Sequence, residues 1–134
     1  MLGEKVADST GKVTSRRVLP NPGGGATVEV TFEAMGKVLG TDEREIGTYT
    51  SVMRPDGTLY GEGQGVIMGK GGERAQWVGS GVGTIKPDGS VSYRGAVYYQ
   101  TPSPAWSRLN TVALVFEHEV DTQGNSHSQL WEWK

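Results

Sequence analysis

The sequence contains no cysteine, which excludes disulfide bonds, thiolate nucleophiles and zinc sites built on thiolates. It also has no apolar run approaching the roughly 18 residues of a membrane-spanning helix. Neither sign of charge dominates, because 13 basic residues stand against 15 acidic ones and the formal net charge is -2. This balance predicts no binding to nucleic acid and none to an anionic membrane. The opening MLGEKVADST lacks the apolar core of a secretory signal, so a cytoplasmic location is expected.

Helical periodicity is missing as well, and apolar residues alternate with polar ones in a period of two, as at Val28, Val30 and Phe32. With 134 residues, the chain is expected to form one domain with one core. The pattern indicates an all-β protein: a single antiparallel meander closed into a small barrel of about eight strands, since closure protects the edge strands. Strands are expected near residues 12–19, 26–38, 44–53, 58–68, 74–85, 91–100, 110–120 and 127–133, loops at 20–25 and 101–108, and a candidate disordered segment at 1–10.

Two turns of nearly the same sequence predict how the central strands pair. The segments MRPDGTL (53–59) and IKPDGSV (85–91) each contain Pro-Asp-Gly, which is typical of a type I turn followed by a glycine in the left-handed conformation. In that geometry the first and last residues of each segment face each other. A further turn lies between these two segments. If the side chains keep the same alternation between the two sheet faces on both sides of this turn, Ile67 lies opposite Ala75. Odd-numbered residues from 45 to 99 then share one face, and even-numbered residues share the other.

The odd-numbered face is rich in glycine and aromatic residues and is nearly free of charge, so it is the expected barrel interior. Its glycines do not form a nucleotide site, because a dinucleotide fingerprint needs another spacing and a βαβ unit. A Walker loop is excluded too, since Lys70 is followed by Gly71 instead of Ser or Thr. The glycines with a period of two are Gly61, Gly63, Gly65, Gly79, Gly81 and Gly83.

Two compatible explanations account for so many strand glycines. The first is curvature, with aromatic rings covering the bare glycines. The second is an internal cavity for a small, largely apolar ligand. The substitutions Gly63→Ala and Gly81→Ala separate them, because the added methyl group is tolerated beside a cavity and overpacks a site beneath a ring. The candidate ligand-binding residues on this face are Tyr49, Trp77, Tyr93 and Tyr99.

The even-numbered face carries two further candidate site residues, Glu62 and Arg94, which lie diagonally across the intervening strand. They are interpreted either as a site that binds a polar ligand or has an acid–base function or, as we favour, as a surface ion pair contributing about 0–1 kcal/mol. The same face is more apolar than a solvated sheet requires, which predicts symmetric association into a homo-oligomer. Its apolar residues are Val66, Met68, Val78, Val82, Ala96 and Tyr98.

The last hairpin contains a histidine-rich segment that suggests a metal site. The turn at 121–125 is expected to place Glu119 opposite His127, while His118 points to the other face. Two ligands do not complete a site, so neither a metal nor a cofactor is predicted. Glu132 is expected to project toward the apolar face, either as a general acid with a raised pKa or, as we favour, solvated at a frayed chain end.

The segments YGEGQGVIM, WVGSGVG, YRGAVYY, LNTVALVFEHEVD and WEWK together carry a family resemblance. Over roughly residues 30–134 the sequence resembles small, mostly bacterial proteins of the allene-oxide-cyclase-like barrel group. The resemblance implies an eight-stranded antiparallel barrel that holds an apolar small molecule in an aromatic-lined cavity. None of the cyclase's catalytic positions is matched, so the substrate of that enzyme is not carried over.

These observations favour a barrel that binds a small, largely apolar molecule without chemistry. One alternative is an isomerase or cyclase of the same architecture, which requires a desolvated carboxylate or arginine inside the cavity. The other is a homo-oligomeric scaffold or interaction protein, whose barrel would be filled by side chains.

Overall fold

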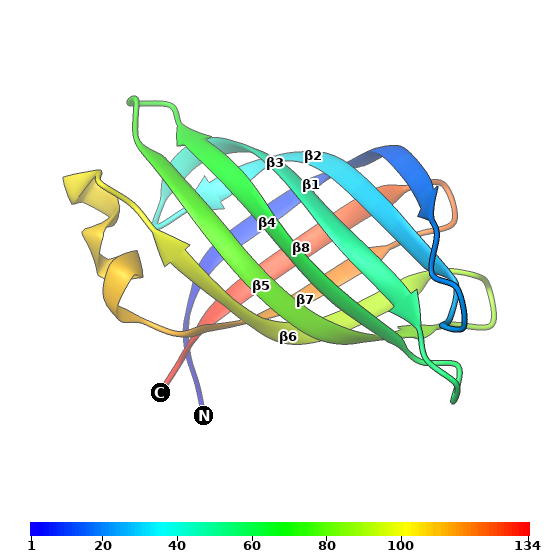
Figure 1. The fold of residues 1–134 in the computed structure, drawn as a ribbon. Coiled ribbons are helices and arrows are strands. Elements are labelled where there is room, and N and C mark those ends of the chain that lie inside the picture. Colours follow the sequence, from blue (N-terminus) through cyan, green and yellow to red (C-terminus); the bar gives the residue numbers. More distant parts are fainter.

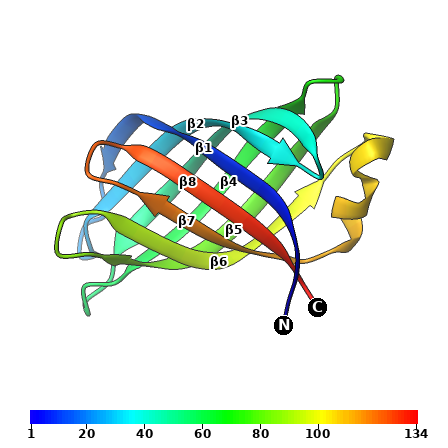
Figure 2. The same cartoon turned by 180° about the vertical axis from the view of Figure 1, so that it is seen from behind.

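The computed structural model describes all 134 residues as a closed antiparallel barrel, which confirms the predicted fold class (Figure 1). Consecutive strands are neighbours around the ring, and the last strand pairs with the first (Figure 2). The elements are β1 (Leu2–Leu19), β2 (Thr27–Val38), β3 (Thr41–Met53), β4 (Leu59–Gly69), β5 (Arg74–Ile85), β6 (Val91–Gln100), the 3-10 helix η1 (Pro104–Thr111), β7 (Leu114–Val120) and β8 (Asn125–Trp133).

The predicted register of the central strands is confirmed. The pairs in question are Met53–Leu59, Ile67–Ala75 and Ile85–Val91. Both Pro-Asp-Gly turns have the expected conformation, since Gly57 and Gly89 adopt φ angles of 88° and 93°. In the first turn, the Asp56 carboxylate accepts a hydrogen bond from the backbone N–H of Thr58 at 2.9 Å. Local turn chemistry therefore sets the alignment of β3 through β6.

Substitution of either turn glycine by valine is expected to destabilise the barrel by about 1–3 kcal/mol, because a β-branched residue resists a positive φ angle. Urea unfolding of Gly57→Val and Gly89→Val measures the effect. Gly57→Asn is the control and should stay closer to the wild type, since asparagine tolerates this conformation. Unchanged midpoints for both valine variants would contradict the assigned turn type.

The odd-numbered face of β3 through β6 lines the barrel interior, as expected from its lack of charge. Inward residues such as Leu59, Ile67 and Val97 are buried, whereas the even-numbered Val66 and Val78 are about half exposed. The inward faces of β2 and β7 also agree with their alternation, because Phe32 and Leu114 are buried. The polarity pattern therefore identifies which face of each of these strands is buried.

The starts of β1 and β7 differ most from the prediction. β1 begins at Leu2, well before the expected start near residue 12, and so includes the candidate disordered segment. Its inward residues Ala7, Ser9 and Gly11 are small or polar, which leaves no apolar alternation to detect. β7 begins at Leu114, because the preceding residues form η1 instead of extending the strand from 110.

The helix η1 covers one end of the barrel (Figure 1). Trp106 and Leu109 are completely buried in the largest apolar cluster, together with inward residues of several strands. The Asn110 side chain fastens the segment, because it accepts a hydrogen bond from the Thr101 N–H and donates one to the Thr101 carbonyl, at 2.8 and 2.9 Å. This helix is 8 residues long, and nothing helical in the chain has the length and hydropathy of a membrane span.

Glu132 lies where η1 meets β8, and both interpretations of this residue were wrong. Its carboxylate is buried and forms an ion pair with Arg108 of η1, so the chain end is not frayed there. The hydrogen bond from Arg108 lowers the pKa of Glu132, which rules out the predicted general acid with a raised pKa. The sequence did not reveal this partner because Arg108 lies in a segment predicted to be a loop.

Candidate functional site

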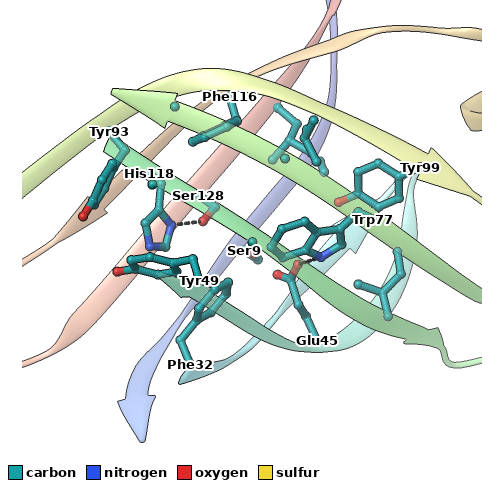
Figure 3. Close-up of a pocket in the computed structure, with 18 of the residues that line it drawn as sticks. Ser9, Phe32, Glu45, Tyr49, Trp77, Tyr93, Tyr99, Phe116, His118 and Ser128 are labelled. Atoms are coloured by element: carbon teal, nitrogen blue, oxygen red, sulfur yellow. Dashed lines mark hydrogen bonds between the residues drawn. The ribbon is translucent and has the colours of Figure 1, made fainter. Parts of the chain in front are cut away.

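A cavity of about 90 Å³ lies inside the barrel (Figure 3). This volume is smaller than the roughly 150 Å³ that hold a benzene molecule in an engineered protein cavity. A ligand with one ring therefore requires a lining side chain to move. The larger apolar and aromatic residues of the wall are Phe32, Tyr49, Ile67, Trp77, Tyr93, Val97, Tyr99, Phe116 and Leu130.

Aromatic rings cover several of the strand glycines. The Trp77 ring lies over Gly65, where even a methyl group would overlap it. A Cβ atom added at Gly83 would lie 2.7 Å from the Tyr93 ring. At Gly61, in contrast, the nearest Tyr93 atom would be 3.4 Å away, which is an ordinary contact. The curvature explanation therefore holds under the rings, and the cavity occupies the space that remains between them.

Two carboxyl groups, Glu43 and Glu45, point inward from β3 and are called the carboxyl pair. Glu45 accepts a hydrogen bond of 2.7 Å from the Trp77 indole Nε1–H (Figure 3). Glu43 is only 5% exposed, and its Oε2 has no hydrogen-bond partner. Burial raises the pKa of each carboxyl from 4.5 to about 7, and the charge of Glu45 contributes to the rise at Glu43.

His118 of β7 forms a second polar centre in the cavity wall. Its Nδ1 is hydrogen-bonded to the Ser128 Oγ at 2.5 Å, whereas its Nε2 is buried without a partner. The ring is 7% exposed and packs among the aromatic rings of Phe32, Tyr49 and Tyr93, with centroid separations of 5.2, 5.8 and 6.3 Å. Burial lowers the pKa of His118 to about 4, so the imidazole is neutral at neutral pH.

A row of cross-strand neighbours connects the two polar centres along the barrel wall. Ser128 and Ser9 are buried, lie opposite each other on β8 and β1, and project into the cavity (Figure 3). Ser128 bonds to His118, and the Ser9 hydroxyl partly offsets the rise in the pKa of Glu45, so each hydroxyl group acts on one of the two centres. In sequence around the barrel, the paired residues are His118, Ser128, Ser9, Gly36 and Glu43.

The structure places four of the predicted site residues in the cavity wall, namely Tyr49, Trp77, Tyr93 and Tyr99 (Figure 3). Glu62 also borders the cavity, but its side chain belongs to the exposed outer face. Its inward neighbours are glycines without side chains, so we infer that Glu62 borders the cavity through its backbone.

Arg94 lies on the outer face, and the expected ion pair with Glu62 was wrong. Arg94 instead pairs with Glu119 at 2.9 Å and with Glu117 at 3.6 Å. The register of β7 places Glu117 directly opposite Arg94, closer than a diagonal neighbour two strands away. This register was not available from the sequence, because η1 interrupts the meander before β7.

Several residues of the site were not recognised in the sequence. Glu43 lies two residues before Glu45 and therefore on the same inward face, but it precedes the predicted strand start at 44. Had the strand been predicted to start earlier, side-chain alternation would have placed Glu43 in the interior. The inward position of His118 was expected, but only its metal-binding potential was considered. The pairing of Glu119 with His127 is confirmed, and the structure contains no group of three or more potential metal ligands.

The carboxyl pair predicts an unusual pH dependence of stability. Between pH 4.5 and 7 the folded state keeps protons that the unfolded chain releases, so the contribution of each carboxyl falls as pH rises. Glu43→Gln removes this effect at one site and should be more stable than the wild type by up to about 3 kcal/mol at pH 8, with little difference near pH 4.5.

Comparing variant with wild type cancels the opposite contribution of His118, which gains stability as pH rises from about 4 to 6.5. Urea unfolding at several pH values provides the measurement. The exposed Glu62→Gln is the matched control and should show no such trend. A Glu43→Gln difference that is independent of pH would contradict the raised pKa of this carboxyl.

The fold and cavity together define a small closed antiparallel barrel with a partly polar interior. No protein-family model matches the sequence, and no curated protein matches it significantly. Solved structures share the fold. A protein of unknown function from Clostridium acetobutylicum has a TM-score of 0.84 at 14% identity, over 96% of this chain and 94% of the other. For a β-barrel-like protein from Acinetobacter baumannii the values are 0.83 and 11%, over 98% and 94%.

An enzyme from Penicillium herquei is also similar, with a TM-score of 0.69 at 16% identity, over 96% of this chain and 92% of the enzyme. At these identities the similarity concerns the fold alone. The chain thus has a small β-barrel fold that also occurs in bacterial proteins of unknown function and in a fungal enzyme.

Proposed function

We propose that the barrel binds a small, largely apolar molecule that carries a polar group. The observation that supports this proposal is the pair of unpartnered atoms, Glu43 Oε2 and His118 Nε2, in the wall of one apolar cavity. Buried polar atoms nearly always have hydrogen-bond partners, and two such atoms beside one cavity are satisfied by a guest molecule or by water.

The architecture supports the same function. Barrels of about eight strands have an interior just wide enough for side chains or for one small ligand. Aromatic walls with a few polar groups are typical of small-molecule sites. Membership in the allene-oxide-cyclase-like group belongs to this proposal, since that resemblance implies an apolar guest. The volume of about 90 Å³ favours a guest no larger than one small ring.

Titration with cyclopentanone, followed by ¹H–¹⁵N NMR of the indole groups, tests the proposal. The Trp77 indole N–H bonds to Glu45 in the cavity wall, whereas Trp133 is 65% exposed on the outside. Binding should shift the Trp77 signal, assigned by its loss in Trp77→Phe, and leave the Trp133 signal unchanged. No shift at about 10 mM probe, a concentration that reveals even weak binding, would overturn the proposal.

A second candidate function is isomerase or cyclase chemistry in the same cavity. The carboxyl pair favours it, because a desolvated carboxylate inside the barrel is the feature that this alternative requires. One structural neighbour is an enzyme, which is compatible with chemistry in this fold. The scaffold alternative is disfavoured, since it requires a filled barrel.

Self-association remains part of the proposed function, with a second copy of the chain as the partner. The outer face of β3 through β6 carries large apolar side chains that are about half exposed. A closed barrel leaves this face uncovered, and symmetric contact between identical patches is the commonest way to bury it. The residues of this outer apolar patch are Ile46, Val66, Met68, Val78, Val82 and Tyr98.

Light scattering at micromolar concentration should therefore give a multiple of the 14.4 kDa chain mass. Val78→Lys places a charge in the patch and should yield a monomer. Val18→Lys is the matched control, because Val18 is exposed on β1, outside the patch, and its replacement should leave the assembly intact. A monomeric wild type would contradict the prediction.

A further inference from the structure

The two unpartnered atoms differ in chemical character and reach the cavity from different strands. Glu43 comes from β3 and His118 from β7, and both line the cavity. Figure 3 shows Glu45 beside Trp77 on one side of the pocket and His118 beside Ser128 on the other. A molecule in the cavity therefore lies between a carboxyl group and an imidazole.

We propose that the cavity catalyses proton transfer next to the carbonyl group of a small, mostly apolar ketone or aldehyde, with Glu43 as the base and His118 as the hydrogen-bond donor to the carbonyl oxygen. This inference rests on the proposed binding function and specifies its substrate class.

The reaction needs no partner beyond the substrate. The Glu43 carboxylate takes the proton from the α carbon, and the electron pair of the broken C–H bond forms a carbon–carbon double bond. The carbonyl π electrons move onto the oxygen, where the His118 Nε2–H stabilises the enolate. Glu43 then returns a proton, either the same one or one exchanged with water, to the same carbon or, in a β,γ-unsaturated substrate, to the γ carbon. The net result is exchange of the proton or movement of the double bond.

Glu43 has the features of such a base. Its Oε2 is unpartnered, whereas the Glu45 carboxylate accepts a hydrogen bond from Trp77. Burial raises the pKa of Glu43 to about 7, which favours a group that must both accept and return a proton near neutral pH. The charge of Glu45, which lies on the same face of β3, contributes to this rise.

His118 has the features of a neutral hydrogen-bond donor. Burial keeps its imidazole uncharged at neutral pH. In the proposed arrangement the Ser128 hydroxyl donates to Nδ1, which places the ring proton on Nε2, the nitrogen that has no partner within the protein. A carboxylate base combined with a neutral imidazole donor is an established arrangement for enolising a carbonyl compound.

Deuterium exchange tests the inference without knowledge of the natural substrate. Cyclopentanone is incubated with the protein in D2O near neutral pD, and loss of its α-proton NMR signal is followed. The wild type should accelerate exchange above buffer. Glu43→Gln should lower the enzymatic rate by about 100-fold or more, and His118→Leu by about 10–100-fold. Glu33→Gln changes an exposed carboxylate of β2 outside the cavity wall and should match the wild type.

The outcomes separate the two proposals. If cyclopentanone shifts the Trp77 indole signal but the wild type exchanges no faster than buffer, the catalytic inference is overturned and binding stands. Equal rates in wild type, Glu43→Gln and His118→Leu would also overturn it. If the Trp77 signal does not shift, the binding function fails and the inference fails with it.

Discussion

Replacement of Trp106 by alanine is expected to destabilise the barrel by about 3–5 kcal/mol, the usual range for removing a large buried aromatic side chain. Trp106 is 0% exposed and packs with Ile67, Leu109 and Leu114 at the end of the barrel covered by η1. The barrel has no other helix to take its place, so the cavity left by the ring cannot collapse easily. Urea unfolding monitored by far-UV circular dichroism measures the loss.

Two variants make the Trp106 result specific. Trp133→Ala removes an indole that is 65% exposed and should change stability by no more than about 0.5 kcal/mol. Trp106→Phe should cost much less than alanine, because it keeps most of the ring and deletes an Nε1–H that has no hydrogen-bond partner. A Trp106→Ala variant as stable as Trp133→Ala would show that η1 does not contribute to the core.

The second large effect concerns the glycines of β4 and β5. Gly63→Ala and Gly81→Ala are each expected to lose about 1–3 kcal/mol through overpacking. A Cβ atom at Gly63 would lie 2.6 Å from the Thr48 carbonyl oxygen and from the Tyr49 Cβ. At Gly81 it would lie 2.7 Å from the Arg94 carbonyl oxygen. Backbone neighbours cannot rotate away, so the strands themselves must separate.

Gly61→Ala is the matched control on the same face of β4. Its added Cβ would have no neighbour closer than 3.4 Å, so stability should stay near that of the wild type. Binding of cyclopentanone should nevertheless weaken, because the methyl group projects toward the cavity that Gly61 lines. Urea midpoints and the Trp77 indole shift give the two readouts. Equal stability losses at Gly61 and Gly63 would contradict this distinction.

The barrel and half of its register could be predicted because the relevant signals are local. A Pro-Asp-Gly turn determines which residues face each other, and side-chain parity then extends along both strands. The prediction failed where the signal depends on distant partners. β1 carries Ser9 on its inward face, and only its pairing with Ser128 of β8 shows that this serine belongs to the interior.

The candidate site was predictable in its walls but not in its chemistry. Tyr49 and Trp77 were predicted to line the cavity from the alternation of side chains along their strands, because aromatic residues on an inward face border any space that remains. The carboxyl pair was harder to recognise, because sequence reasoning assigns charge to the outside. Glu45 is tolerated inside because the Trp77 indole supplies a hydrogen bond.

The pairing of β1 with β8 also brings the chain ends together. The backbone N–H of Lys134 donates a hydrogen bond of 2.8 Å to the carbonyl of Met1, and the two ends lie side by side in Figure 2. Because every strand has a neighbour on both sides, the order of strands around the ring is cyclic. A circular permutant that joins these ends and opens the exposed turn at 54–57 would keep all eight strand pairings. The present break in the chain is thus one of several equivalent places at which the same ring can be cut.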